Sequence, residues 1–256
     1  MKPLRVCVRH EGQHVRLVID RPKGNIITAE VIAALRASLA DLPKAGAVKL
    51  VTLEGAGDHF SFGASVEEHL PDAIGRVLPE LHALVRDLLA VPAPTAAVVR
   101  GRCLGGGFEL ALACDFIFAS QDATLGVPEI ALGVFPPAAT AILPIKVGAA
   151  KAAEAVLTGE ATSAARWAEL GLVTLVAPAA ELESAVDRWF ETRLAAKSAA
   201  ALRHAALAVR MAVRESALPR LAELEDVYLT QLMRTHDAVE GIQAFIAKRA
   251  PQWRNA

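Results

Sequence analysis

We predict an α/β fold for this chain, because short β-branched runs alternate with helical stretches over its first two thirds. From about residue 149 onwards, Ala, Leu, Glu and Arg dominate, which predicts helices. The 256 residues, 54% of them hydrophobic, can bury a sizeable core without a staple, in one large domain or two small ones. We therefore expect an α/β core over residues 1–195 and a C-terminal helical subdomain over residues 196–256.

The first two thirds contain four strand candidates, each rich in β-branched or other apolar residues. They are Val15–Asp20, Val48–Glu54, Thr95–Gly101 and Asp115–Ser120. A helix is predicted between the first two, over Ala29–Leu42, whereas Gly107–Cys114 between the last two has room for no more than two helical turns. Strands separated by helices indicate an α/β domain with crossover connections.

The last third is predicted to be mostly helical, with one short strand at Leu172–Val176. Four amphipathic helices are expected there, over Ser184–Leu194, Ser198–Val213, Leu218–Met233 and Asp237–Lys248. Pro178 and Pro219 are placed at helix starts, where a missing N–H is tolerated. The apolar faces of these helices can pack on the core or bury against another subunit, and both interpretations stay open.

Composition and charge exclude several functional classes. The 27 Lys and Arg residues nearly balance 28 Asp and Glu residues, which argues against a nucleic-acid binder that relies on a general basic field. The longest uncharged stretch, Ile130–Ile145, is too short for a membrane span and is broken by three prolines. Cys7, Cys103 and Cys114 fit neither a disulfide framework nor a zinc site, and no signal peptide is evident. We therefore expect a cytoplasmic protein without nucleic-acid, membrane or metal partners.

Two glycine-rich segments follow predicted strands and are candidates for a binding site. They are Glu54–Ser65 and Gly101–Asp115, and the second opens a short helix. Glycine lets the backbone turn sharply and approach a ligand closely, and the free N–H groups at a helix N-terminus suit an anion. One such loop is common for packing alone. Two in one domain can each supply an N–H to a single oxygen, which is the geometry of an oxyanion hole.

Two glutamates lie on otherwise apolar segments and are candidates for proton transfer. Glu109 falls in the first turn of the helix after the glycine run, and Glu129 lies in LGVPEIALGVF. Taken singly, Glu109 can simply favour the helix dipole, and Glu129 can be a solvated loop charge. Because no charge follows Glu129 until Lys146, both carboxylates are also candidates for a raised pKa and acid–base work.

Other catalytic patterns are weak in this sequence. GAGDHF (residues 55–60) is a near miss to a dinucleotide fingerprint, because Phe60 stands at its third glycine position. Ser65 lacks the second glycine of a serine-nucleophile elbow. His59 and His69 flank this loop, where surface or packing roles are the commoner use of histidine.

Four segments that follow one another along the chain resemble the crotonase superfamily, the enoyl-CoA hydratase/isomerase group. They are DRPKGNI (residues 20–26), HFSFGASVEEH (59–69), RGRCLGGGFELALACD (100–115) and LGVPEIALGVFP (125–136). EGIQAFIAKR (240–249) resembles the C-terminal signature of that family, so the resemblance covers nearly the whole chain. It implies a crotonase-like spiral of ββα units with a C-terminal helical trimerisation region, assembled as a homotrimer or a dimer of trimers.

The resemblance also implies an acyl thioester of coenzyme A as substrate and gives roles to individual residues. The N–H groups of Ala64 and Gly106 match the two donors of the oxyanion hole. Glu109 and Glu129 match the two glutamates with which hydratases hold and activate water. Positions that match contacts to coenzyme A are Lys23, Gly24 and Asn25 in the adenine loop and Phe245 and Lys248 near the C-terminus. No metal or redox cofactor is required, because coenzyme A is part of the substrate.

Departures from the usual family pattern indicate a narrower group. Ser65 replaces a common Asp, and PPAAT (residues 136–140) replaces PGAGG, so that Pro137 cannot donate a backbone N–H. Asn25-Ile26-Ile27 also replaces a usual Asn-Ala-Leu. With HFSFGASVEEHLP and GVFPPAAT, the chain resembles the cyclohexa-1,5-diene-1-carbonyl-CoA hydratases of anaerobic benzoyl-CoA degradation.

Three phenylalanines border these motifs, namely Phe62, Phe108 and Phe135. They either flank a flat ring substrate or pack in the core. The narrower resemblance implies that water adds across a conjugated cyclic diene, with the hydroxyl at the β-carbon and the proton at the far γ-carbon. We therefore predict a hydratase (a hydro-lyase) that acts on an α,β-unsaturated acyl-CoA, with a cyclic dienoyl-CoA as the expected substrate.

Other functions remain open at this stage. A linear-chain enoyl-CoA hydratase, an enoyl-CoA isomerase and an acyl-CoA hydrolase all occur in the same superfamily. The retained pair of Glu109 and Glu129 favours hydration over isomerisation or thioester hydrolysis and does not separate cyclic from linear substrates. A non-catalytic CoA-binding protein is disfavoured by the intact oxyanion and glutamate positions.

Overall fold

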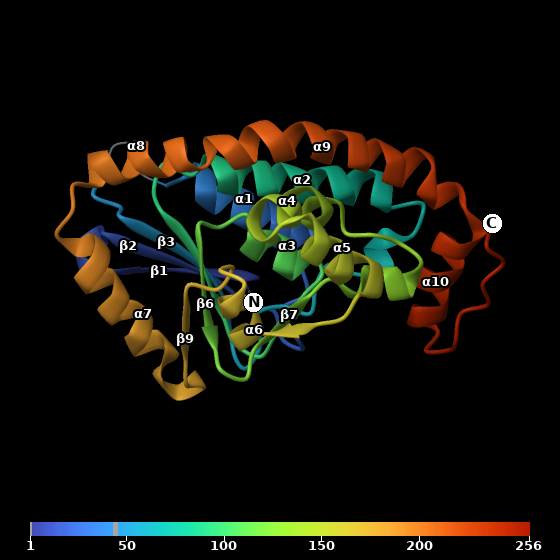
Figure 1. Ribbon diagram of the computed structural model, residues 1–256, viewed down its shortest axis with the longest axis horizontal. Coiled ribbons are helices and arrows are strands. Elements are labelled where there is room, and N and C mark those ends of the chain that lie inside the picture. Colours follow the sequence, from blue (N-terminus) through green and yellow to red (C-terminus); the bar gives the residue numbers. More distant parts are fainter. Residues whose placement is uncertain (1, 43–45) are drawn as a thin grey trace.

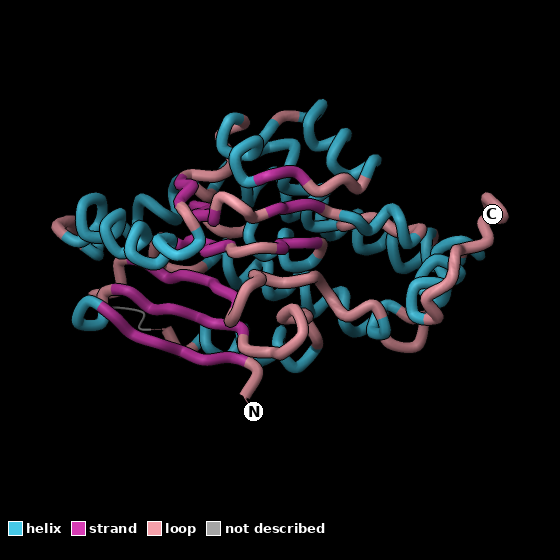
Figure 2. The backbone as a smooth tube through the Cα atoms, turned by 90° about the horizontal axis from the view of Figure 1, so that it is seen from below, coloured by secondary structure: helices cyan, strands magenta, loops and turns pink. Residues whose placement is uncertain are grey.

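A six-stranded sheet forms the centre of the fold in the computed structural model, which describes residues 2–42 and 46–256. Its strands, in spatial order, are β1 (Leu4–Arg9), β2 (His14–Ile19), β3 (Leu50–Gly55), β4 (Thr95–Val99), β6 (Phe116–Ser120) and β9 (Leu175–Ala177). β1 runs antiparallel to β2, and the pairs from β2 to β9 are parallel (Figure 2). Parallel neighbours need crossover connections, which confirms the predicted organisation of the α/β part.

A second sheet of three strands lies next to the glycine-rich segments. It consists of β5 (Arg102–Leu104), β7 (Thr124–Gly126) and β8 (Thr162–Ser163). The chain passes from β4 into β5 through Gly101, whose φ of +49° favours glycine. A side chain at Gly101 would also collide with His59 and the backbone of Asp58. An isolated bridge between Ser61 and Cys103 then joins the first glycine-rich segment to β5.

Helices surround the two sheets. The α-helices are α1 (Ala29–Ala40), α2 (Ile74–Ala90), α3 (Gly106–Leu112), α4 (Pro137–Val147), α5 (Ala149–Thr158), α6 (Ala164–Glu169), α7 (Leu182–Phe190), α8 (Ala199–Val209), α9 (Met211–Thr230) and α10 (His236–Ile246). In Figure 1, α9 runs along the long axis of the molecule over α2 and α4, and α10 lies at the opposite end from α7. Among the described residues, no helix is both long and apolar enough to cross a membrane.

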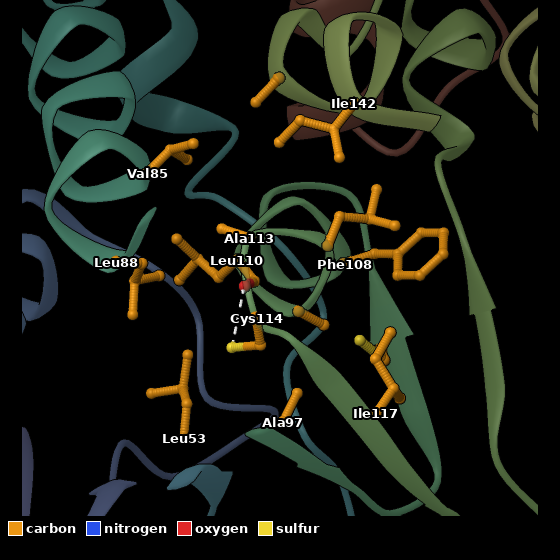
Figure 3. Close-up of a cluster of buried hydrophobic side chains, with 14 of the residues drawn as sticks. Leu53, Val85, Leu88, Ala97, Phe108, Leu110, Ala113, Cys114, Ile117 and Ile142 are labelled. Atoms are coloured by element: carbon orange, nitrogen blue, oxygen red, sulfur yellow. Dashed lines mark hydrogen bonds between the residues drawn. The ribbon is translucent and has the colours of Figure 1, made fainter. Parts of the chain in front are cut away.

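The main hydrophobic core lies between the large sheet and helices α1 to α4. Figure 3 shows its centre, where Leu53 of β3 and Ala97 of β4 lie below Leu110 of α3. Every residue of α3 is buried, including Glu109. The short helix that carries this carboxylate is therefore fixed by packing on all sides.

The strands and the helix predicted for the first two thirds are confirmed, with ends that differ by up to two residues. Strand β1 was not predicted. It is an edge strand on which Val6 and Val8 are 53% and 60% exposed, so its apolar residues do not mark a buried face. The predicted strand Leu172–Val176 begins three residues later, at Leu175.

The predicted helix boundary near Pro219 is wrong. Helix α8 ends at Val209 and α9 begins at Met211, so Pro219 lies inside α9 rather than at a helix start. Pro219 cannot donate to the carbonyl of Glu215 one turn earlier. Because Glu215 is exposed, water can replace the missing N–H and the helix continues.

Candidate active site

Two free backbone N–H groups lie where the glycine-rich segments approach each other. Ala64 forms an isolated parallel bridge with Ile27. The N–H of Ile27 donates to Gly63 O (2.9 Å), and the N–H of Ser65 donates to Ile27 O (3.0 Å). This pairing leaves the N–H of Ala64 without a backbone acceptor in the described part of the chain. Gly106 is the first residue of α3, so its N–H has no acceptor within the helix either.

Ala64 and Gly106 are direct neighbours in space. A β-carbon added to Gly106 would lie 3.2 Å from the backbone nitrogen of Ala64 and 3.2 Å from its β-carbon. Glycine at position 106 therefore allows the two segments to approach. Two unpartnered donors side by side can both bind one carbonyl oxygen and stabilise the charge that develops on it.

Glu109 is held at the N-terminus of α4. Its Oε1 accepts a hydrogen bond from the N–H of Ala139 (3.0 Å), and the backbone of Ala138 also interacts with the carboxylate. Burial raises the pKa of Glu109, and these two backbone donors oppose that rise. Pro137 occupies the first position of α4, where it loses a donor, but the next two residues supply the donors to Glu109.

Glu129 lies in a short 3₁₀ helix, Pro128–Leu132, and is half-buried, with its Oε2 atom shielded from solvent rather than exposed on a loop. Its Oε2 has no hydrogen-bond partner in the described residues. Burial raises the pKa of Glu129, and the negative charge of Glu109 raises it further. Gly105, with φ of +50°, passes close beside this carboxylate, because an added β-carbon would lie 2.5 Å from Glu129 Oε1.

A cavity of about 510 Å³ opens next to these groups. Four of the residues predicted from the sequence line it, namely Phe62, Ala64, Glu129 and Phe245. Most of the remaining wall is apolar and comes from 3₁₀ helix 128–132, from Val134 and from the C-terminal residues Gly241, Ile242 and Pro251. One donor and one carboxylate thus face a largely apolar cavity, as expected of a site for an apolar acyl group. Gly106 and Glu109 do not line it, but Gly106 adjoins Ala64, and the charge of Glu109 acts on Glu129.

Two of the three phenylalanines predicted to flank the substrate do not line this cavity. Phe108 is fully buried in the hydrophobic core (Figure 3). Its ring packs against Trp167 with centroids 5.6 Å apart. Phe135 packs edge-on against Tyr228 with centroids 5.5 Å apart. Of the two interpretations given for these rings, packing in the core is therefore the correct one for Phe108 and Phe135, because each ring is directed away from the cavity. Phe62 alone of the three remains a wall residue.

The predicted adenine loop forms a separate depression of about 330 Å³, which includes Lys23, Gly24 and Asn25. The loop adjoins the main cavity, because Phe62 N–H donates to Gly24 O (2.8 Å). Lys23 is exposed and free to meet a ligand. Asn25, by contrast, is buried, and its amide donates to Ala56 O (2.9 Å) and His59 O (2.8 Å). Asn25 therefore lines the depression while its side chain holds the loop in place.

Of the two C-terminal residues predicted to contact coenzyme A, one lines the cavity and the other does not. Phe245 of α10 is 56% exposed and lines the cavity, whereas Lys248 is exposed but does not line it. Arg249 lines the cavity instead, one residue further along. Both basic residues lie in the EGIQAFIAKR segment, and periodicity alone did not separate them.

Sequence reasoning missed two further polar residues, Arg102 and Tyr228, and favoured a surface or packing role for His69. Arg102 and His69 line the cavity, and His69 Nδ1 lies 2.7 Å from Ser65 O. Burial lowers the pKa of His69, so its ring is neutral at neutral pH. Tyr228 of α9 packs against Phe135 and lies more than 90 residues beyond Glu129 in the chain. No local pattern links it to the motifs that predicted the site.

Comparisons with known proteins agree with this geometry. The profile of the enoyl-CoA hydratase/isomerase family matches residues 12–256. The cyclohexa-1,5-dienecarbonyl-CoA hydratase of Thauera aromatica is 44% identical over 253 residues, which cover 99% of this chain and 97% of that protein. A putative enoyl-CoA hydratase/isomerase of Bacillus subtilis, YngF, is 32% identical over 93% of this chain and 94% of its own. The crystal structure of an enoyl-CoA hydratase from Mycobacterium avium subsp. paratuberculosis superimposes with a TM-score of 0.86, at 32% identity and with 98% of each chain covered. The chain therefore belongs to the enoyl-CoA hydratase/isomerase family.

Proposed function

We propose that this enzyme adds water to a cyclic dienoyl thioester of coenzyme A, cyclohexa-1,5-diene-1-carbonyl-CoA. The observation that carries the proposal is the 44% identity to the Thauera aromatica hydratase over nearly the full length of both chains. Two Bacillus subtilis relatives, a putative enoyl-CoA hydratase/isomerase and a probable enoyl-CoA hydratase, are 32% and 33% identical to this chain. The buried pair of glutamates beside two free N–H donors supports a hydration reaction in particular.

The two backbone donors act on the thioester carbonyl. When water attacks the β-carbon, an electron pair moves through the α-carbon to the carbonyl oxygen, and a dienolate forms. The N–H groups of Ala64 and Gly106 bind this oxygen and stabilise its negative charge. Because they are fixed by the bridge at Ile27 and by the start of α3, they need no rearrangement during the reaction.

The environments of the two glutamates give them different roles. Glu109 accepts hydrogen bonds from the N-terminus of α4, which favour its ionised form, so it takes the proton from water. Glu129 has no such donor on Oε2 and faces the charge of Glu109, so it stays protonated and delivers the proton to the γ-carbon. Water thus supplies the hydroxyl to the β-carbon and one proton to Glu109, and the enzyme returns to its starting state when Glu109 releases that proton and Glu129 regains one.

A panel of substrates tests the proposal. Wild-type protein is incubated with the cyclic dienoyl-CoA and with crotonyl-CoA, and the gain of one water is followed by mass. We expect kcat/KM for the cyclic substrate to exceed that for crotonyl-CoA by at least about 10-fold, the low end of what a fitted apolar pocket gives. Phe62→Ala should narrow this gap, because Phe62 lines the cavity and can contact the ring by its face. Equal or better activity on crotonyl-CoA would remove the ring substrate and leave a linear-chain hydratase.

Several wider features belong to the same proposal. The chain is proposed to form a crotonase-like spiral with a trimerisation region, as a homotrimer or a dimer of trimers, in the cytoplasm. Exposed apolar residues on α8 and at the start of α9, Val209 and Met211, support a subunit contact there. Residues 1–195 are proposed as the α/β core and residues 196–256 as the helical subdomain. The donors and carboxylates suffice for the chemistry, so we propose no cofactor beyond the coenzyme A of the substrate.

A further inference from the structure

Tyr228 is the single tyrosine of the chain, and its hydroxyl is buried without a partner. The residue lies on α9 and is 1% exposed. Its Oη makes no hydrogen bond to any described residue. A buried hydroxyl without a partner destabilises a fold, and phenylalanine would fill the same space without that cost. The oxygen of Tyr228 therefore calls for a partner that residues 2–42 and 46–256 do not supply.

The ring of Tyr228 packs against residues that form the wall of the cavity. Its ring contacts Phe135 and belongs to a cluster with Val134 and Ile242, both of which line the cavity. Burial raises the pKa of Tyr228, and the negative charges of Glu129 and Glu109 raise it further. Both carboxylates are therefore near enough to act on the hydroxyl.

A second unpartnered oxygen lies at the same place, and the backbone cannot serve it. Oε2 of Glu129 is buried and accepts no hydrogen bond among the described residues. At the N-terminus of α4, Pro137 has no N–H, and the following two residues direct theirs to Glu109. A water molecule between these groups would find acceptors on both glutamates but no donor from α4.

We propose that Tyr228 is a positioning residue for hydration and that its O–H donates a hydrogen bond to the reacting water between Glu109 and Glu129. The hydroxyl replaces the donor that Pro137 removes, and it turns a lone pair of the water towards the β-carbon. The water in turn completes the hydrogen bonding of the buried Tyr228 and Glu129 oxygens. This role rests on the proposed hydration reaction.

The first test removes the hydroxyl and keeps the ring. We expect Tyr228→Phe to lower kcat on the cyclic dienoyl-CoA by about 10-fold or more, the scale expected when one fixed donor is lost, with KM within about 2-fold of wild type. Its Tm should stay equal or rise, because an unpartnered hydroxyl has gone. Met233→Leu changes the same cluster without touching a polar atom and should leave kcat within about 2-fold. Wild-type kcat in a folded Tyr228→Phe protein would overturn the proposal.

The second test reads the position of the hydroxyl without turnover. Because the chain has one tyrosine, 3-fluorotyrosine incorporation gives a single ¹⁹F NMR signal from position 228. We expect this signal to move in Glu129→Gln and in Glu109→Gln, and to stay in place in Glu160→Gln, whose side chain is exposed. A signal that neither active-site substitution moves would overturn the role of Tyr228 alone. Failure of the wild-type protein to hydrate any enoyl-CoA would instead overturn the proposed function and the positioning role together.

Discussion

At the scale of single residues, the site separates two glutamates by their surroundings. Glu109 receives backbone donors from α4, whereas Glu129 has an unpartnered oxygen and a negative neighbour. The same side chain can therefore serve as base at one position and as acid at the other. Burial raises both pKa values, two backbone donors from α4 oppose the rise at Glu109, and the charge of Glu109 adds to the rise at Glu129.

The two glutamates should each control one limb of the pH profile of kcat, so that replacing each by its amide removes a different limb. We expect Glu109→Gln and Glu129→Gln each to lower kcat by at least about 10²-fold, as is typical when general acid–base help is lost. Residual activity should lose the acidic limb in the first variant and the basic limb in the second. Binding of a CoA thioester should survive in both, because the oxyanion donors are backbone groups.

Steady-state kinetics from pH 5 to 9 and calorimetric binding measure these effects, with Glu160→Gln as the control. Near-wild-type turnover in either variant would remove that glutamate from the mechanism.

The raised pKa of Glu129 also makes stability depend on pH. Its folded-state pKa lies above the ordinary value of 4.5, so the folded protein holds a proton that the unfolded chain releases as pH rises. The contribution to stability is therefore complete below pH 4.5 and declines as pH rises towards the folded-state pKa. Glu129→Gln avoids this loss, and we expect its Tm to exceed that of wild type by about 2 °C or more at pH 8. A shift of about 2 °C corresponds to a gain of about 1 kcal/mol or less in the free energy of unfolding.

Thermal unfolding at pH 5 and pH 8 measures the difference. A gap between variant and wild type that is the same at both pH values, or that shrinks as pH rises, would contradict the prediction.

At the scale of elements, the loop that leads into α3 makes a tight backbone turn at Gly105, and this turn leaves the space that the carboxylate of Glu129 occupies. Gly105 needs its φ of +50°, and the space beside it is filled by Glu129 Oε1. We expect Gly105→Ala to lower kcat by about 10²-fold or more, because the new methyl group displaces the carboxylate and strains the turn. Gly75→Ala in α2 meets no atom within 4 Å and should leave kcat unchanged.

Turnover and Tm of both variants check this prediction. A folded Gly105→Ala protein with wild-type kcat would show that the carboxylate tolerates displacement.

The elements that carry local signals were predictable from the sequence. The convergence of Ala64 with Gly106 follows from two glycine-rich segments at strand ends, and both glutamates stand out on apolar segments. Phe108 could not be assigned correctly, because on a helix buried on every side no periodicity distinguishes core from cavity. Tyr228 could not be found at all, since only tertiary packing brings α9 to this site.

At the scale of the whole molecule, the C-terminal residues form one wall of the cavity. Trp253 packs against glycines from two separate segments, because β-carbons added to Gly133 and Gly241 would lie 3.2 and 2.8 Å from its ring. The carboxylate of Asp237 accepts hydrogen bonds from Arg254 N and Asn255 N, each at 2.7 Å. This anchorage holds the tail against α10 and the 3₁₀ helix that carries Glu129.

Removing the Trp253 side chain should weaken substrate binding more than it slows the chemical step. We expect Trp253→Ala to raise KM for CoA thioesters by about 10-fold, the low end of what loss of a fitted apolar wall costs, with a smaller change in kcat. Gln252→Ala removes an exposed neighbouring side chain and should leave both constants within about 2-fold of wild type. Initial-rate measurements over a range of substrate concentrations separate KM from kcat. An unchanged KM in Trp253→Ala would show that the tail does not support the wall.

This wall has a consequence for the timing of synthesis. Both oxyanion donors and both glutamates lie within residues 64–129, whereas the cavity is closed by Gly241, Ile242, Phe245, Arg249 and Pro251. Domains form progressively as a chain leaves the ribosome, from the N-terminal side onwards. A nascent chain can therefore assemble its acid, its base and its oxyanion donors while the site is still open to water. It can enclose a substrate only after residues 241–251 have emerged.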